Sequence, residues 1–461
     1  MCSSDLGGDQ QFDAAGNLQP IGKLSDDGAD TLANYGTVGS IVFGGGADDD
    51  ILLNSGTGSV TGSLSFAGDS GDDVFRNEGL AGSLVFTGGA DDDVLVNLSA
   101  GIGTINFGGD AGDDILLNQG SGVGTLTFTG GADDDLLLNT ASTLTTLTFS
   151  GGADDDVLQN SGGSITTLTF TGDSGADILR NTGSGITSLV FGGGADDDIL
   201  SSTGTNIGSL VFGGDIDAGT GLPIAGTNYG ADRLILSGSG TGAGTSTVLF
   251  QGDDGADAFL NSATGFVTIT FNGGADDDVF QNTASSIGGI TFSGGADDDV
   301  LQNSGASLTS LVFGGDSGAD VLYNTGATVS GLVFTGGADD DVFYNTGAAL
   351  SGAIFTGGAD DDVLVNSGAD VSGLVFTGGA DDDVLQNSGT GLLDLVFSGD
   401  AGNDRFWNRS AAVNASNLSF TGADGDDLFL NDAGGAAGLT FTGGADDDAF
   451  QNAGEIGRAH V

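Results

Sequence analysis

The residues best placed to do chemistry are aspartates, which recur in clusters at a regular spacing. Eleven clusters read Gly-Gly-Ala-Asp-Asp-Asp, and nine related ones carry Gly at the fourth place. We number these six turn positions 1 to 6, with the last aspartate at position 6. Aligned on that residue, the chain holds 20 copies, most of them 21 residues apart, which end at Asp30, Asp50, Asp73, Asp93, Asp114, Asp135, Asp156, Asp177, Asp198, Asp232, Asp257, Asp278, Asp299, Asp320, Asp341, Asp362, Asp383, Asp404, Asp427 and Asp448.

Stacked turns of this kind would pile carboxylates over carboxylates. At a strand spacing of about 4.8 Å, adjacent charges repel by about 3.5 kcal/mol at an effective dielectric of 20. Clustered carboxylates and backbone oxygens are the ligands that Ca²⁺ prefers. Seven of the nine Gly-4 copies carry Asp at position 2, which keeps the number of carboxylates nearly constant. The predicted calcium ligands are the position-6 aspartates above and the position-4 aspartates Asp48, Asp91, Asp133, Asp154, Asp196, Asp276, Asp297, Asp339, Asp360, Asp381 and Asp446. The alternative is an acidic surface that only confers solubility, but the scarcity of Glu argues against it.

Composition excludes several classes of function. Seven basic against 65 acidic residues give a net charge of −58, which repels nucleic acid and anionic lipid headgroups. A single Cys and a single His exclude a disulfide framework, a Cys/His zinc site and a Ser/His/Asp triad within the chain. No apolar run approaches the roughly 20 residues that span a bilayer. We therefore expect no catalysis, no nucleic-acid binding and no membrane insertion.

A fixed period of this length indicates stacked supersecondary units. Each unit holds two short segments rich in Val, Leu, Ile and Phe, separated by two turns rich in Gly, Ser and Asp, and Gly at this density disfavours helix. The predicted fold is all-β: a single elongated parallel β-solenoid or β-roll of about 20 coils of 21 residues, with two short strands per coil. The repeat domain spans residues 7–454, with turn insertions near 9–24 and 215–229.

Period-two alternation assigns the faces of the strands. Leu or Phe two residues after the position-6 aspartate should point inward, as should one Phe per coil in the second strand. Asn stands four residues after that aspartate in 18 of 20 copies, which predicts a hydrogen-bonded Asn ladder or simply a residue suited to turns. Apolar residues such as Val342 and Tyr344 fall on the outer side, where they reflect either β-propensity or lateral self-association.

The two ends differ in composition from the repeat. Residues 1–6 contain the only Met and Cys, and residues 455–461 contain the only His. The codons GAG-ATC-GGA-AGA-GCA-CAC-GTC of a common sequencing adapter encode the last seven residues. We therefore interpret both ends as translated adapter sequence and the rest as an internal fragment of a longer protein.

The turn and the following strand resemble the RTX, or hemolysin-type, nonapeptide G-G-x-G-x-D-x-U-x. The resemblance rests on segments such as Gly68-Asp-Ser-Gly-Asp-Asp-Val-Phe-Arg76 and covers about nine residues in each 21-residue copy. It implies a secreted bacterial protein in which turns of successive coils sandwich Ca²⁺ through the motif Asp and turn carbonyls. Here the second turn of each coil lacks the motif, so one calcium-loaded edge is expected, and eleven copies depart by carrying Asp at position 4.

These observations favour a noncatalytic, calcium-dependent structural or adhesive repeat region of a large secreted or surface bacterial protein. Its partners would be calcium ions and cell-surface or matrix ligands, and its location extracellular. Two other interpretations stay open. Thr-x-Thr pairs at Thr125, Thr146 and Thr167 suggest an ice- or surface-binding solenoid, although the pattern is not sustained along the chain. The segment could instead be the calcium-binding secretion module of an enzyme whose catalytic domain lies outside it.

Overall fold

The computed structural model describes residues 28–214, 230–241, 246–305, 307–326, 328–409, 415–432 and 437–452. The predicted adapter ends and the two predicted turn insertions, 9–24 and 215–229, lie outside these residues. The chain divides into two compact units, the first formed by Met1–Tyr229 with Gly238–Thr241 and the second by Gly230–Ser237 with Gly242–Val461. Each unit is described by itself.

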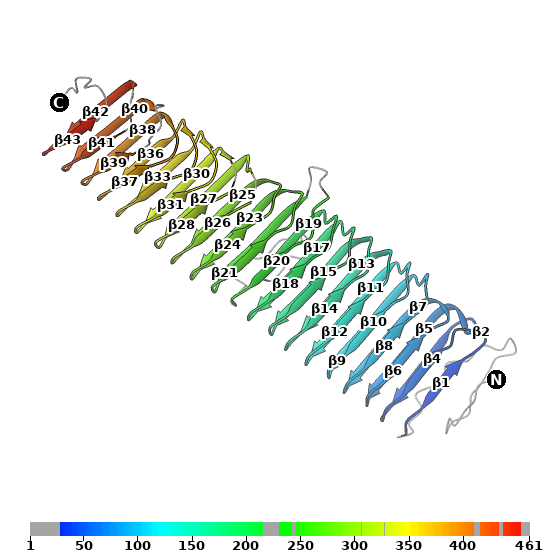
Figure 1. The fold of residues 1–461 in the computed structure, drawn as a ribbon. Coiled ribbons are helices and arrows are strands. Elements are labelled where there is room, and N and C mark those ends of the chain that lie inside the picture. The colour runs from blue at the N-terminus through cyan, green and yellow to red at the C-terminus, as the bar shows by residue number, and fades with distance from the viewer. Residues whose placement is uncertain are drawn as a thin grey trace. The chain divides into compact units, whose positions relative to one another are not determined.

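In the first unit, every coil contributes to each of two sheets, and one coil's contribution to the second sheet is divided into two strands (Figure 1). The first sheet consists of the four-residue strands β1 (Thr31–Asn34), β4 (Ile51–Asn54), β6 (Val74–Asn77), β8 (Val94–Asn97), β10 (Ile115–Asn118), β12 (Leu136–Asn139), β14 (Val157–Asn160), β16 (Ile178–Asn181) and β18 (Ile199–Ser202). The second sheet consists of β2 (Thr37–Val38), β3 (Ile41–Gly46), β5 (Ser59–Ser70), β7 (Leu80–Ala90), β9 (Thr104–Ala111), β11 (Thr125–Ala132), β13 (Leu144–Gly152), β15 (Ile165–Ser174), β17 (Ser188–Ala195) and β19 (Ser209–Gly213).

The second unit repeats this plan. Its first sheet consists of β20 (Arg233–Leu236), β22 (Ala258–Asn261), β24 (Val279–Asn282), β26 (Val300–Asn303), β28 (Val321–Asn324), β31 (Val342–Asn345), β34 (Val363–Asn366), β37 (Val384–Asn387), β39 (Arg405–Asn408), β41 (Leu428–Asn431) and β43 (Ala449–Asn452). Its second sheet consists of β21 (Thr247–Asp254), β23 (Phe266–Ala275), β25 (Ile287–Gly295), β27 (Ser310–Ser317), β29 (Val329–Ser330), β30 (Leu332–Ala338), β32 (Leu350–Ser351), β33 (Ile354–Gly358), β35 (Val371–Ser372), β36 (Val375–Gly379), β38 (Leu392–Ala401), β40 (Ala415–Asp424) and β42 (Ala437–Gly444).

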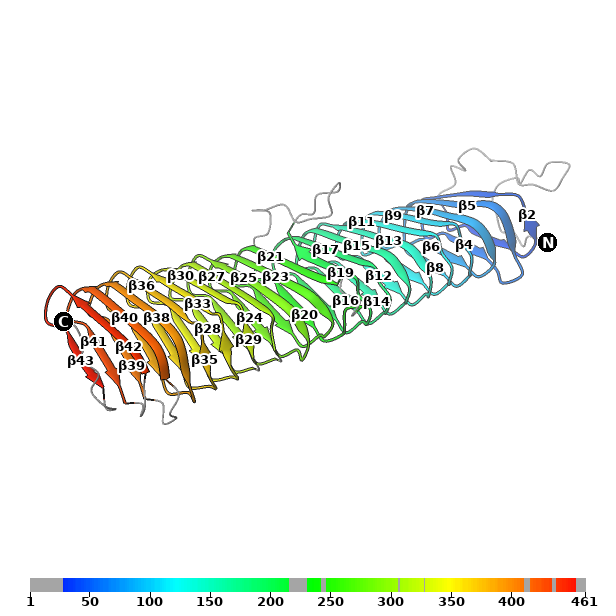
Figure 2. The ribbon, with the colours of Figure 1, turned by 90° about the horizontal axis from the view of Figure 1, so that it is seen from above.

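Strands of successive coils pair in parallel and in register, so each residue lies over its equivalent one repeat away. Ile115 of β10 pairs with Leu136 of β12, and Phe128 of β11 pairs with Phe149 of β13. Within each unit, both views show the strands following one another coil by coil in chain order (Figure 2). The described residues contain no helix. The predicted all-β parallel solenoid with two strands per coil is therefore confirmed.

The core lies between the two sheets and is built from stacked rows of identical side chains. Leu116 and Leu137 from the first sheet, and Phe128 and Phe149 from the second, are all 0% exposed, as the period-two alternation predicts. The rings of Phe128 and Phe149 stack with centroids 4.8 Å apart and an interplanar angle of 4°. This spacing follows from the parallel register, because it sets each ring directly above its equivalent in the next coil.

The predicted Asn ladder is confirmed at the end of the first-sheet strands. The side-chain amide of Asn118 donates to Oδ1 of Asn139 at 2.9 Å, and Asn139 donates in the same way to Asn160 at 2.8 Å. These residues are fully buried. At one of the two exceptions in the sequence, Ser202, the hydroxyl accepts from Asn181 at 3.1 Å and so preserves the acceptor role.

No helix in the part of the chain that the structure describes is long and apolar enough to cross a membrane.

Candidate metal centre in the aspartate turns

The aspartate turn joins each second-sheet strand to the first-sheet strand that follows it, and its backbone explains why Gly and Asp exchange places. In the turn ending at Asp93, Gly89 at position 2 has φ 127° and Asp91 at position 4 has φ 76°. In the turn ending at Asp114, Asp110 at position 2 has φ 84° and Gly112 at position 4 has φ 111°. In these two turns both positions have positive φ, and Gly, which has no Cβ, occupies the one with φ above 100°. Ala423, at position 2 of the turn ending at Asp427, departs from this pattern with φ 113°. The exchange thus has a conformational cause, and it does not by itself require a ligand.

The position-6 aspartates form a buried row inside the turn. Asp93, Asp114 and Asp135 are 0%, 0% and 1% exposed. Oδ1 of each accepts the backbone N–H of the position-6 aspartate in the preceding coil, as in Asp93 N–H to Asp114 Oδ1 at 2.8 Å and Asp114 N–H to Asp135 Oδ1 at 2.9 Å. The carboxyls stack in register as the sequence predicts, but they point into the protein, and only Asp448 at the end of the row is half-buried.

In much of this row the second carboxyl oxygen has no hydrogen-bond partner. Such orphaned, buried Oδ2 atoms occur in Asp50, Asp73, Asp93, Asp114, Asp135, Asp156, Asp177, Asp257, Asp278, Asp299, Asp320, Asp341, Asp362, Asp383, Asp404 and Asp427. An ionised oxygen in this position would forfeit its hydration without compensation. The row therefore needs neutralisation, either by a proton on each carboxyl or by a bound cation.

Burial shifts the acidity of these groups in the same direction along the row. Desolvation raises the pKa of Asp50 to about 6, that of Asp114 to about 8 and that of Asp257 to about 9, from an ordinary value of 3.8. The backbone N–H from the preceding coil opposes the shift, and neighbouring carboxylates add to it. Without a counter-ion, the carboxyls with the largest shifts, such as Asp114 and Asp257, are therefore mostly neutral at pH 7, whereas Asp50 is mostly ionised.

Glycine at position 1, which the sequence analysis did not single out, makes room for this row. A Cβ added to Gly68 would overlap Oδ2 of Asp73 and would lie 2.7 Å from the carbonyl oxygen of Gly88 in the next coil. The orphaned oxygen thus lies against glycine backbone and shares its surroundings with a backbone carbonyl. The sequence does contain a signal for this role. Gly stands five residues before the position-6 aspartate in every copy except those that end at Asp30 and Asp232.

The position-4 aspartates lie elsewhere, on the exposed rim of the turn. Some of them bond to Gly at position 4 of the preceding coil: Oδ2 of Asp91 accepts Gly71 N–H at 3.2 Å, and Oδ2 of Asp133 accepts Gly112 N–H at 3.3 Å. The structure therefore separates the predicted ligands into a buried position-6 row and an exposed position-4 row.

Position 5 supplies a third row, which the sequence analysis left out of the predicted ligands. Oδ1 of Asp92 accepts the N–H of Asp113 in the following coil at 2.9 Å. Oδ1 of the position-6 aspartate instead accepts a backbone N–H from the preceding coil. The two rows thus tie each turn to both of its neighbours, which gives the aspartates a structural role independent of any ion.

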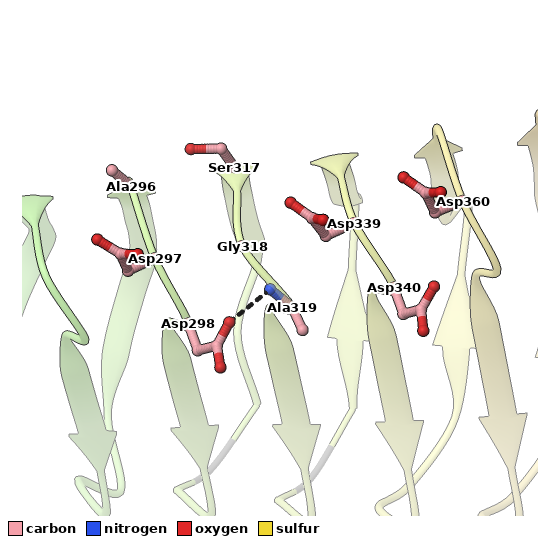
Figure 3. A pocket seen from close by; sticks show the side chains of 9 residues that line it. All are labelled: Ala296, Asp297, Asp298, Ser317, Gly318, Ala319, Asp339, Asp340 and Asp360. Atoms are coloured by element: carbon pink, nitrogen blue, oxygen red, sulfur yellow. Dashed lines mark hydrogen bonds between the residues drawn. The ribbon is translucent and has the colours of Figure 1, made fainter.

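The acidic rim has a hollow of about 500 Å³ in the second unit (Figure 3). It opens where the turn ending at Asp320 carries Gly318 and Ala319 in place of two aspartates. Asp298 and Asp340 flank it, and Asp298 Oδ1 accepts the N–H of Ala319 at 2.8 Å. The lining residues are Ala296, Asp297, Asp298, Ser317, Gly318, Ala319, Asp339, Asp340 and Asp360.

The oxygen donors of the turns are of the kind that Ca²⁺ binds. Among the described residues, no group of three or more His, Cys, Asp or Glu side chains is arranged to hold a metal ion. What coils such as those ending at Asp73 and Asp114 offer instead is an unpartnered carboxyl oxygen and a nearby glycine carbonyl of the next coil, which are hard oxygen donors. Comparison of the chain with family models, with curated proteins and with solved structures found no match.

Proposed function

We propose that this chain is a noncatalytic repeat region, structural or adhesive, of a large exported bacterial protein, and that calcium stabilises its fold. The supporting observation is the buried row of position-6 carboxyls, sixteen of which have an oxygen without a hydrogen-bond partner. Near-identical turns recurring along both units support a structural role rather than a single active site. The RTX-like turn motif supports export.

The hydrogen bonds of the position-6 carboxyls leave only some oxygen atoms available to bind calcium. Oδ1 of each position-6 aspartate is already occupied by a backbone N–H, so Oδ2 and the nearby glycine carbonyls are the available donors. A bound Ca²⁺ supplies positive charge that lets the carboxyls ionise without mutual repulsion. Because the unfolded chain cannot bring these oxygens together, binding energy becomes folding energy. A chain with a net charge of −58 would then stay expanded in low calcium and fold in the calcium-rich exterior.

A calcium titration tests this proposal. At pH 8 in excess chelator, where the raised pKa values leave part of the row ionised, we expect a weak β signal in circular dichroism. Adding millimolar Ca²⁺ should restore it, while Mg²⁺ at equal ionic strength should not, because Mg²⁺ gives up its water reluctantly. Full β structure in chelator at this pH, unchanged by Ca²⁺, would contradict the proposal.

A second candidate function, binding to an ordered surface such as ice, is favoured by one feature of the first unit. Thr125, Thr146 and Thr167 pair in register across β11, β13 and β15, and a second row of Thr127, Thr148 and Thr169 runs beside it. All six side chains are half-buried on the outer side of the second sheet. The array ends at Ser188 and Val190 in β17. Thermal hysteresis that is lost on Thr148→Leu would support this function, and its absence in the parent chain would exclude ice.

A further inference from the structure

The outer side of the first sheet in the second unit has no acidic residue. Its strands bury their second and fourth residues and turn the first and third outward. In five successive coils these outward pairs are Val300 and Gln302, Val321 and Tyr323, Val342 and Tyr344, Val363 and Val365, and Val384 and Gln386. In the same unit, most acidic side chains lie on the rim of the aspartate turn, where these strands begin, and the Asn ladder lies where they end. Asp432, which follows Asn431, is the exposed acidic residue next to that ladder.

A parallel sheet with apolar residues on both sides is typical of a sheet covered on both faces. Here Val279 and Tyr323 are 40% and 39% exposed, and the rings of Tyr323 and Tyr344 stack at 5.1 Å to form a flat surface. The 11 four-residue strands of this sheet make a face of roughly 50 by 13 Å, or about 650 Å². Two such faces would bury about 1,300 Å², which lies within the range of specific protein interfaces.

Charge limits what can cover this face. Its charged groups in the second unit are Arg233 and Arg405, and Arg409 packs over the ring of Trp407 at 3.2 Å just beyond β39. A negatively charged partner on this face would be repelled by the acidic rim beside it. A second copy of the chain offers an apolar face of the same length and coil spacing, so its rows match without any adjustment.

We propose that two copies of this chain pair face to face through the outer side of the first sheet of the second unit. Repulsion between the acidic rims decides between two possible orientations of the two-fold axis. A two-fold axis along the direction of coil stacking places the rim of one copy over the Asn corner of the other. An axis along the strands would bring the two rims together, where their aspartates repel. The copies therefore run parallel, and each coil faces the same coil of its partner. The side chains at the first residue of each strand then lie over those at the third residue of the partner's strand.

Sedimentation equilibrium of the full chain in millimolar Ca²⁺ tests the pairing. We expect a dimer, and Val363→Asp should weaken it about tenfold or more because it buries an unpaired charge. Thr356→Asp, on the outer side of the second sheet in the preceding strand β33, is the matched control and should leave the dimer unchanged. Circular dichroism checks that both variants fold. A monomeric parent, or a dimer lost only in Thr356→Asp, would overturn the proposal.

Spin labels test the parallel arrangement independently of any loss of folding. In a chain with Cys2→Ser, labels on Gln302→Cys and on Gln386→Cys in separate samples should both give the same short distance between copies. In an antiparallel pair, the two positions lie four coils, or about 19 Å, apart along the stack and cannot both be short. Different distances for the two labels would overturn the parallel pairing, and so would equal distances of about 19 Å or more, which an antiparallel pair centred on β31 would give. Because this test uses folded protein in calcium, it does not depend on whether calcium drives folding.

Discussion

The backbone N–H of Asp114 donates to Oδ1 of Asp135, one coil further on, at 2.9 Å, while Oδ2 of Asp135 is buried against Gly130 without a hydrogen-bond partner. One half of each position-6 carboxyl thus holds adjacent coils together. The other half depends on neutralisation, which links folding to protons and to cations.

Without divalent cations, the fold should lose stability as the pH rises. The pKa of Asp135 is raised from 3.8 to about 8 by burial, so its contribution is fully present below about pH 4 and is lost as the pH rises through 8. Across the row the loss should begin near pH 4 and should end between about pH 6, for Asp50, and about pH 9, for Asp257. Urea unfolding in chelator at a series of pH values measures it, and a midpoint that rises from pH 5 to pH 9 would contradict it.

Asp135→Asn should reduce the response to calcium. The amide is neutral at every pH, so the variant should be more stable than the parent in chelator at pH 8 and should gain less from added Ca²⁺. Asp133→Asn, at the exposed position 4 of the same turn, is the matched control. Unfolding midpoints with and without Ca²⁺ separate the two variants, and equal calcium responses would remove Asp135 from the candidate ligands.

Gly130→Ala should destabilise the first unit. Its Cβ would overlap Oδ2 of Asp135, and overpacking of this kind costs about 1–3 kcal/mol. Gly108→Ala is the control, since a Cβ there meets nothing within 4 Å and the residue is not left-handed. Chemical denaturation followed by circular dichroism compares them, and a similar cost for both changes would show that the close approach at Gly130 is unimportant.

Asn139→Ala should break the Asn ladder on both sides. Asn118 loses its acceptor and Asn160 loses its donor, both inside the protein, which costs about 2–4 kcal/mol in unfolding free energy. Asn139→Ser should cost less, because Ser202 already accepts from Asn181 in the native ladder. Gln159→Ala, on the exposed side of β14, controls for loss of an amide. We expect the loss of unfolding free energy to be largest for Asn139→Ala, smaller for Asn139→Ser and smallest for Gln159→Ala. A reversed order would be inconsistent with the ladder.

The repeat pattern alone predicted the parallel solenoid, the inward rows of Leu116 and Phe128, and the Asn ladder. These features follow from period and alternation, because a residue that recurs once per coil must stack on itself when the strands pair in register. The same reasoning placed the aspartates in register. It did not distinguish position 4 from position 6, since both repeat with the same period.

Only the tertiary structure decided which carboxyls are buried and why Gly and Asp exchange places. Asp93 turns inward because Gly88 leaves space for its Oδ2 and the preceding coil offers an N–H to its Oδ1, whereas Asp91 lies outside in a left-handed conformation. Spacing in the sequence shows only the period at which a residue type recurs. The free energy of a charge depends on how closely backbone from neighbouring coils surrounds it, and that distance exists only in the folded chain.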